Sequence, residues 1–104
     1  MTVTRNNNTA EKATPAQLQE AAALLREVLD FSAPADQALS AFFRAHSKLG
    51  RQDRAFIAEC VYGVLRHLLA LKWLLPNGSP ALWIRLWLMR FQGWGLRELE
   101  KLTT

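Results

Sequence analysis

The chain has only one cysteine, Cys60, among its 104 residues, which excludes an intramolecular disulfide. Its hydrophobic runs are short, because none approaches the roughly 20 residues that a membrane-spanning helix needs. The N-terminus lacks the order of charged, apolar and small residues that marks a secretory signal peptide. These absences predict a cytoplasmic protein, and we expect neither a membrane nor a metal ion among its partners.

Recognisable catalytic signatures are also missing. The two histidines, His46 and His67, have no carboxylate or nucleophile at a recognisable spacing, so we interpret both as residues at the rim of a core. Cys60 falls on an apolar helical stripe, which favours a buried side chain over a reactive thiolate. No glycine-rich turn between a strand and a helix is present to bind a nucleotide-like cofactor. The sequence therefore predicts no catalytic residue and no cofactor on this chain.

The composition is typical of a folded domain. Half of the residues are hydrophobic and 21% are charged, whereas disordered chains have far fewer hydrophobic residues. Residues 1–13 include three successive asparagines and show no apolar periodicity, so we expect a flexible tail there. Residues 14–104 are long enough for one hydrophobic core and are predicted to form a single domain.

The spacing of the apolar residues predicts helices throughout this domain. Thr14, Pro15 and Gln17 form a helix-start signal, and Ser79 with Pro80 forms another. Between them we expect helices over residues 35–47 and from about residue 53 to 75. The helix at 53–75 is apolar around most of its circumference, which predicts a place in the middle of a bundle. The helix that follows Pro15 has one apolar face and is predicted to lie at the surface. A short amphipathic helix is expected at the C-terminal end, so the fold class is all-α, a bundle of about five to six helices.

The charge is unevenly distributed along the chain. Residues 37–75 hold six basic and two acidic side chains, a net charge of +4, whereas residues 1–36 have a net charge of −2. Four of these basic residues lie on one helix end, the segment around Gly50 and the start of the next helix, and we expect them to meet at one corner: Arg44, Lys48, Arg51 and Arg54. Guanidinium groups and the amides of a helix N-terminus both suit phosphate oxygens. Asp53 is expected to cap the helix start or to pair with Arg54 or Arg66.

Short motifs in residues 35–75 occur in the order of a known family. They are Asp36-Gln37-Ala38-Leu39, Leu49-Gly50, Asp53-Arg54 and Val61-Tyr62-Gly63-Val64-Leu65-Arg66. This order resembles the NusB-like N-terminal domain of the Sun/Fmu-type 16S ribosomal RNA cytosine-C5 methyltransferases. In that family an all-helical RNA-binding domain precedes an S-adenosylmethionine-dependent catalytic domain. The resemblance implies a NusB-like antiparallel bundle with ribosomal RNA as its partner, and it places Lys48, Arg51, Arg54 and Arg66 on or beside the matched motifs.

The chain departs from the family because the catalytic half would have to follow Thr104. The expected role is therefore that of an RNA-binding accessory domain in ribosomal RNA processing, and whether it forms part of an enzyme is left open. S-adenosylmethionine would be a cofactor only if a catalytic domain follows. Arg66 is weighed equally as an RNA contact and as an ion-pair partner. Tyr62 is expected either to stack on an unpaired base or, with better odds, to pack at a helix interface.

The C-terminal part is rich in tryptophan, and its role has alternatives. Trp83, Trp87 and Phe91 are predicted either to complete the core or to dock a methyltransferase catalytic domain or another protein. The second of these makes the chain a protein-interaction module rather than an RNA-binding domain. A third alternative is peripheral membrane attachment through residues 82–91, since an amphipathic helix can lie in a membrane interface.

Overall fold

A computed structural model of the chain describes residues 13–101, and within that range six helices and no strand are formed. The helices are α2 (Pro15–Val28), α3 (Ala35–Ala45), α4 (Arg51–Arg66), α5 (Leu68–Leu74), α6 (Pro80–Gln92) and α7 (Leu96–Lys101). The predicted all-α class with five to six helices is confirmed. The predicted tail, residues 1–13, lies outside the described residues apart from Ala13, which packs against the core.

Two helices begin where the local sequence predicts. At the start of α2 the Thr14 hydroxyl accepts a hydrogen bond from the Gln17 amide, and the Gln17 side-chain oxygen accepts one from the Thr14 amide. These reciprocal bonds form the predicted capping box and satisfy amides that a helix start leaves free. At the start of α6 the Ser79 hydroxyl accepts from the Leu82 amide. Both signals act over three residues, so they do not depend on the tertiary fold.

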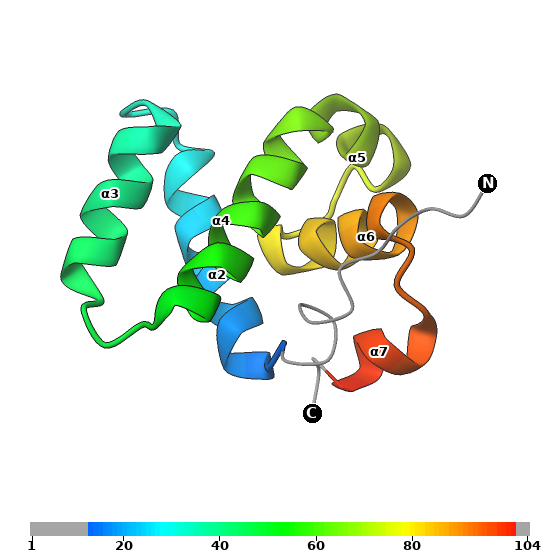
Figure 1. Cartoon of the computed structure of the whole chain (residues 1–104). Helices are drawn as coiled ribbons and strands as arrows, with labels where there is room; N and C mark the ends of the chain where they lie inside the picture. The colour runs from blue at the N-terminus through cyan, green and yellow to red at the C-terminus, as the bar shows by residue number, and fades with distance from the viewer. Residues whose placement is uncertain (1–12, 102–104) are drawn as a thin grey trace.

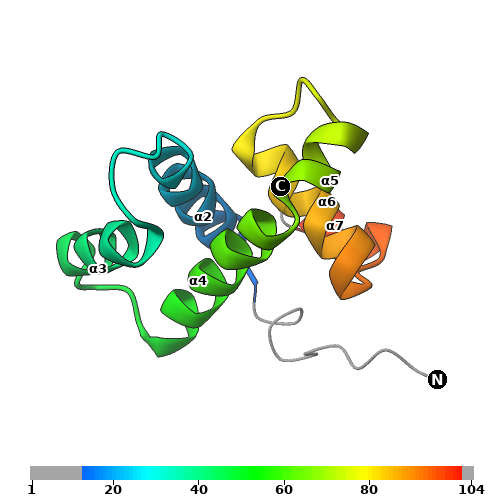
Figure 2. The same cartoon turned by 90° about the horizontal axis from the view of Figure 1, so that it is seen from above.

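Helices α2 and α4 run through the middle of the bundle (Figures 1 and 2). α3 covers one side of this pair, and α5 and α6 lie on the other side (Figure 2). α4 packs against α2, α5 and α6, in agreement with the predicted place in the middle of the bundle. α2 was predicted to lie at the surface, but it packs against α3, α4 and α6 and buries seven of its residues. The prediction of a surface helix is wrong because alanines and leucines occupy two neighbouring faces of α2.

The segment predicted as one helix over residues 53–75 is divided at His67. The His67 amide donates to the Val64 carbonyl, three residues back, which tightens the end of α4. The imidazole ring stacks on Phe91 of α6, with 3.9 Å between ring centroids. α5 then starts at Leu68 in a new direction (Figure 1). Only Leu71 of α5 is fully buried, so the outer face of this helix is left uncovered by the other described helices.

α4 and α6 approach each other closely at a glycine. Trp87 is buried, and its indole lies so close to Gly63 that a Cβ added there would overlap the ring. The nearby Trp83 is also buried, and its indole N–H donates to the Leu75 carbonyl at 3.0 Å. These two tryptophans thus join α6 to α4 and to the end of α5. Every helix within residues 13–101 is too short or too polar to cross a lipid bilayer.

Candidate functional site

Four basic side chains lie around the connection from α3 to α4, and we call them the basic corner: Arg44, Lys48, Arg51 and Arg54. Arg44 is in the last turn of α3, Arg51 is the first residue of α4, and Lys48 lies in the loop between these helices. All four side chains are exposed. The loop and the two helix ends are at the lower left of Figure 1. The structure therefore puts these residues on neighbouring helix ends, with their charges open to solvent.

Arg54 is the most constrained member of the basic corner. Its Nε donates a hydrogen bond to the Leu49 carbonyl at 3.1 Å. Its Cζ lies 5.8 Å from the centroid of the Phe43 ring, within the range of a cation–π contact. These contacts hold the guanidinium against the end of α3 and use only one of its three nitrogens. The two terminal nitrogens can form a forked contact with an anion.

The N-terminus of α4 adds backbone donors to the basic corner. Its N-cap residue is Gly50, which has no side chain to accept from the first amides of the helix. The first amide bonded within the helix is that of Arg54, which donates to the Gly50 carbonyl at 3.0 Å. The start of a helix carries a partial positive charge, so this end of α4 favours an anion as the arginines do.

Asp53 is the acidic residue closest in sequence to these cations, and it is engaged with neutral partners. Its Oδ2 accepts from the Gly50 amide at 3.0 Å, which confirms the predicted cap. Its Oδ1 accepts from the Gln17 side chain of α2 at 2.6 Å. Within residues 13–101, it makes neither of the predicted ion pairs, with Arg54 or with Arg66. The hydrogen bonds from Gln17 and Gly50 lower the pKa of Asp53 below its ordinary value.

Arg66, the fifth predicted RNA contact, is separate from the basic corner. It lies in the last turn of α4, twelve residues after Arg54, which corresponds to about 18 Å along the helix axis. Its side chain is exposed. An RNA that touches both arginines would have to extend along most of α4. Tyr62, one turn before Arg66, is partly buried and packs against the core, in agreement with a role at a helix interface.

The predicted docking residues do not form an exposed surface. Trp83 and Trp87 lie in the core, and Phe91 is partly buried beneath His67. These three side chains therefore complete the core, which is the other of the two predicted roles. They do so because α4 and α5 both pack against large apolar side chains of α6. The exposed tryptophan is Trp73 on α5, which the sequence pattern did not distinguish from its neighbours.

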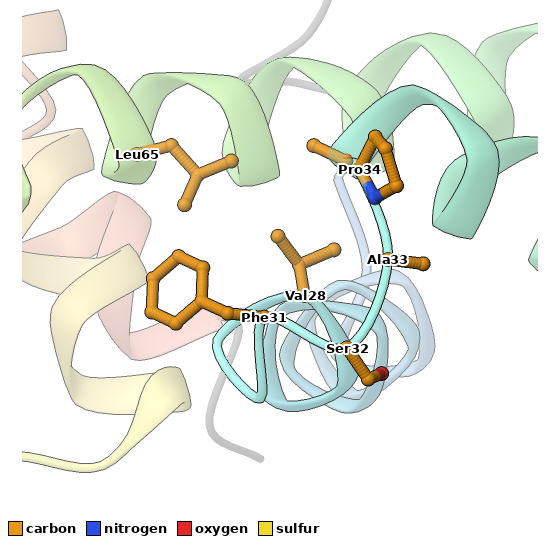
Figure 3. A pocket seen from close by; sticks show the side chains of 7 residues that line it. Val28, Phe31, Ser32, Ala33, Pro34 and Leu65 are labelled. Carbon is orange, nitrogen blue, oxygen red and sulfur yellow. The ribbon is translucent and has the colours of Figure 1, made fainter.

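The surface formed by residues 13–101 includes two pockets outside the central core. One, of about 420 Å³, is lined by residues from the end of α2, the loop after it and α4. In Figure 3 the side chains of Val28, Phe31 and Leu65 point toward one another across it. Phe31 has a φ of 56°, a conformation that non-glycine residues rarely adopt. The second pocket, of about 300 Å³, lies beside the basic corner and is lined in part by Glu20, His46 and Lys48.

Cysteine and histidine are common catalytic residues, but Cys60 and His46 make structural contacts here. Cys60 is fully buried, and burial, with a smaller effect of Glu59, raises the pKa of its thiol well above 9.0. The His46 ring stacks on Phe42, and its Nδ1 lies 2.8 Å from the Phe42 carbonyl oxygen. Its Nε2 lies 3.8 Å from a Glu20 carboxylate oxygen. In the described part of the chain no cluster of three potential metal ligands is formed.

Comparisons of the chain with models of protein families, with curated proteins and with solved structures found no match. Function is therefore inferred from the chemistry of the basic corner and from the motifs in residues 35–75.

Proposed function

We propose that the chain is an RNA-binding accessory domain that contacts ribosomal RNA through the basic corner. The proposal extends to the family that residues 35–75 resemble, the NusB-like N-terminal domain of the Sun/Fmu-type methyltransferases. The observation that carries it is the placement of four exposed cations around the start of α4, where the N-cap residue Gly50 has no side chain to bond the first amides. On this proposal the chain acts in the cytoplasm, in ribosomal RNA processing, and any S-adenosylmethionine is held by a separate catalytic domain.

The chemistry of the corner suits the RNA backbone. Arg51 and Arg54 present planar, forked donors to phosphate oxygens, and Lys48 adds a compact charge. The amides at the start of α4 give directional donors next to these cations. Contacts of this kind position a nucleic acid without reading its bases. The domain would therefore deliver affinity and orientation, and the choice of target would depend on other contacts.

The number of cations sets the expected strength of binding. Four side chains neutralise only a few phosphates, and each one changes the logarithmic salt slope by about 0.7–0.9. Binding by this chain alone should therefore be modest at physiological salt and should strengthen steeply as the salt concentration falls. Asp53 opposes an approaching phosphate less than a free carboxylate would, because Gln17 and Gly50 already donate to its two oxygens.

The test removes two of the four cations. The double variant Arg51→Ala with Arg54→Ala should bind a structured ribosomal RNA fragment more weakly, and its salt slope should fall by about 1.4–1.8. The matched control is Arg26→Ala with Arg97→Ala, which removes the same charge from two exposed sites outside the corner. This control variant should keep most of the salt dependence of RNA binding. Equal slopes for the wild-type chain and the corner variant would refute the assigned surface.

A further inference from the structure

The outer face of α5 exposes large apolar side chains that no other element within residues 13–101 covers. Leu69 and Trp73 lie four residues apart, hence on one face of the helix, and are 85% and 84% exposed. Leu74 beside them is about half exposed. The other three tryptophans, Trp83, Trp87 and Trp94, are buried, so Trp73 is an exception within its own residue type.

This face is held in a defined position by the opposite side of the same helix. Leu71 is fully buried in the core. The end of α5 is fixed by the hydrogen bond from the Trp83 indole to the Leu75 carbonyl, 3.0 Å long. Lys72 lies with its Nζ 5.8 Å from the centroid of the Trp83 ring. Leu69 and Trp73 thus project from an anchored helix.

The chain segment that contains this face carries charge of one sign. Residues 61–97 contain no aspartate or glutamate. They contain five basic side chains: Arg66, Lys72, Arg85, Arg90 and Arg97. Arg66 and Lys72 are exposed and lie within three residues of Leu69. The buried Nε of Arg85 finds no hydrogen-bond partner among residues 13–101. A partner of this face must therefore combine apolar material with negative charge.

We propose that the outer face of α5 docks on an anionic lipid surface. Leu69 and Trp73 enter the boundary between headgroups and acyl chains, and Arg66 and Lys72 contact the lipid phosphates. Tryptophan is the side chain most characteristic of this boundary, because its ring is large and apolar and its N–H prefers water. This differs from the expectation drawn from the sequence, which placed residues 68–75 inside the bundle and considered membrane attachment only as an alternative, through residues 82–91.

The shape and the charge of the face favour a lipid surface over a protein partner. A stable protein interface takes about 20–30 residues on each side, whereas this face presents two protruding apolar side chains, Leu69 and Trp73, on one short helix. A fluid bilayer needs no complementary pocket for such side chains. A second copy of the chain would bring like charges together if the two α5 faces met, which opposes self-association through them.

The α5 face is distinct from the basic corner. In Figures 1 and 2 the end of α3 and the start of α4 lie on one side of the bundle, and α5 lies on the other. The two surfaces can therefore be altered separately. A corner variant that loses RNA should retain lipid binding, so failure of either proposal leaves the other to be judged by its own measurement.

The test uses sedimentation with two kinds of vesicle and the emission of tryptophan. Vesicles of equal parts phosphatidylglycerol and phosphatidylcholine should sediment the wild-type chain, and vesicles of phosphatidylcholine alone should sediment much less of it. Binding should move the tryptophan emission to shorter wavelength, because Trp73 leaves water while the other three tryptophans are already buried. High salt should weaken binding, because it screens the attraction between the basic side chains and the lipid phosphates. The chain that remains bound should still show tryptophan emission at shorter wavelength.

Two variants assign the contact to α5. Leu69→Ser keeps Trp73 as the reporter, and Trp73→Ala is followed by sedimentation. Each should weaken binding to the anionic vesicles by about tenfold or more. The free energy gained by burying one large apolar side chain is larger than the free energy that corresponds to a tenfold change in affinity. Phe31→Ala is the matched control, since Phe31 is also exposed but belongs to the loop after α2, between Asp30 and Asp36 in the sequence. Circular dichroism checks that all three variants keep their helices.

Three outcomes would overturn the proposal. One is the absence of sedimentation with anionic vesicles. Another is wild-type binding by Leu69→Ser and Trp73→Ala. The third is quenching of Trp73 by the single-stranded RNA poly(U) with no response to vesicles, which would assign the face to base stacking instead.

Discussion

The side-chain amide of Gln17 donates a 2.6 Å hydrogen bond to the carboxylate of Asp53 and thereby joins the N-termini of α2 and α4. The same glutamine caps α2 through the Thr14 amide, and the same aspartate caps α4 through the Gly50 amide. Each residue thus performs a local task and also contacts its counterpart on the other helix. The pair fixes the start of α4, from which Arg51 and Arg54 project.

Breaking this pair should destabilise the fold from either side. Asp53→Ala removes the cap of Gly50 and the partner of Gln17, and we expect a loss of about 1–2 kcal/mol in the free energy of unfolding. Gln17→Ala should lose a similar amount because it removes the reciprocal cap of α2. The double variant should cost less than the sum of the two, which urea unfolding measures. Gln19→Ala, at an exposed site of α2, is the control. Strict additivity would contradict the coupling.

Acid should weaken the fold through the same carboxylate. The pKa of Asp53 in the folded chain lies below the ordinary value of 3.8, because Gln17 and Gly50 donate to its ionised form. Its contribution is complete above pH 3.8 and is lost as the pH falls from there through the folded pKa. The Asp53→Asn variant should therefore lose less of its free energy of unfolding at acid pH than the wild-type chain does. Urea unfolding between pH 2 and 7 measures this difference. Parallel curves for the two chains would exclude Asp53 as a source of acid sensitivity.

Gly63 should tolerate no side chain. In an open helix, alanine would be favoured over glycine by about 1 kcal/mol. At this position the added Cβ overlaps the Trp87 indole, so we expect Gly63→Ala to lower stability by about 1–3 kcal/mol instead. Gly95→Ala is the control, because its Cβ would meet only the Glu98 carboxylate oxygen at 3.6 Å. Thermal unfolding followed by circular dichroism compares the two. A more stable Gly63→Ala chain would show that α4 and α6 can separate without cost.

Phe31 should be replaceable with a gain in stability. Its φ of 56° is unfavourable for any residue with a Cβ, and its ring is 68% exposed, so little packing would be lost. Phe31→Gly should raise the free energy of unfolding by about 0.5–1 kcal/mol after the entropy of glycine in the unfolded chain is included. Phe31→Ala keeps the unfavourable φ and should show no such gain. A glycine variant no more stable than the alanine variant would argue against backbone strain at this turn.

The features predicted best from the sequence are those set by neighbouring residues. The starts of α2 and α6 follow from Thr14 with Gln17 and from Ser79 with Pro80, because these side chains bond amides only three residues away. The apolar stripe of α4 was predicted by its helical spacing, and the burial of Cys60 confirms it. The position of the basic corner also follows from order along the chain, since Arg44 and Arg51 flank one short loop.

The features predicted least well depend on contacts between distant segments. The division at His67 is made where its ring stacks on Phe91 of α6, and no local breaker residue announces it. The burial of Gln17 arises because Asp53 lies close enough to accept its side-chain amide. The separation of Arg66 from the basic corner became clear only with the length and direction of α4 in place.

The amino-acid sequence by itself determined that this chain is helical, where its capped helices begin and that its positive charge gathers near residues 44–54. Those properties arise from spacing and from bonds within one or two helical turns. Only the tertiary structure decided which apolar residues are covered: Trp87 is buried because Gly63 leaves space for its ring, whereas Trp73 is exposed because α5 turns away at His67. Both tryptophans lie in apolar helical segments, and burial depends on whether another segment reaches that face.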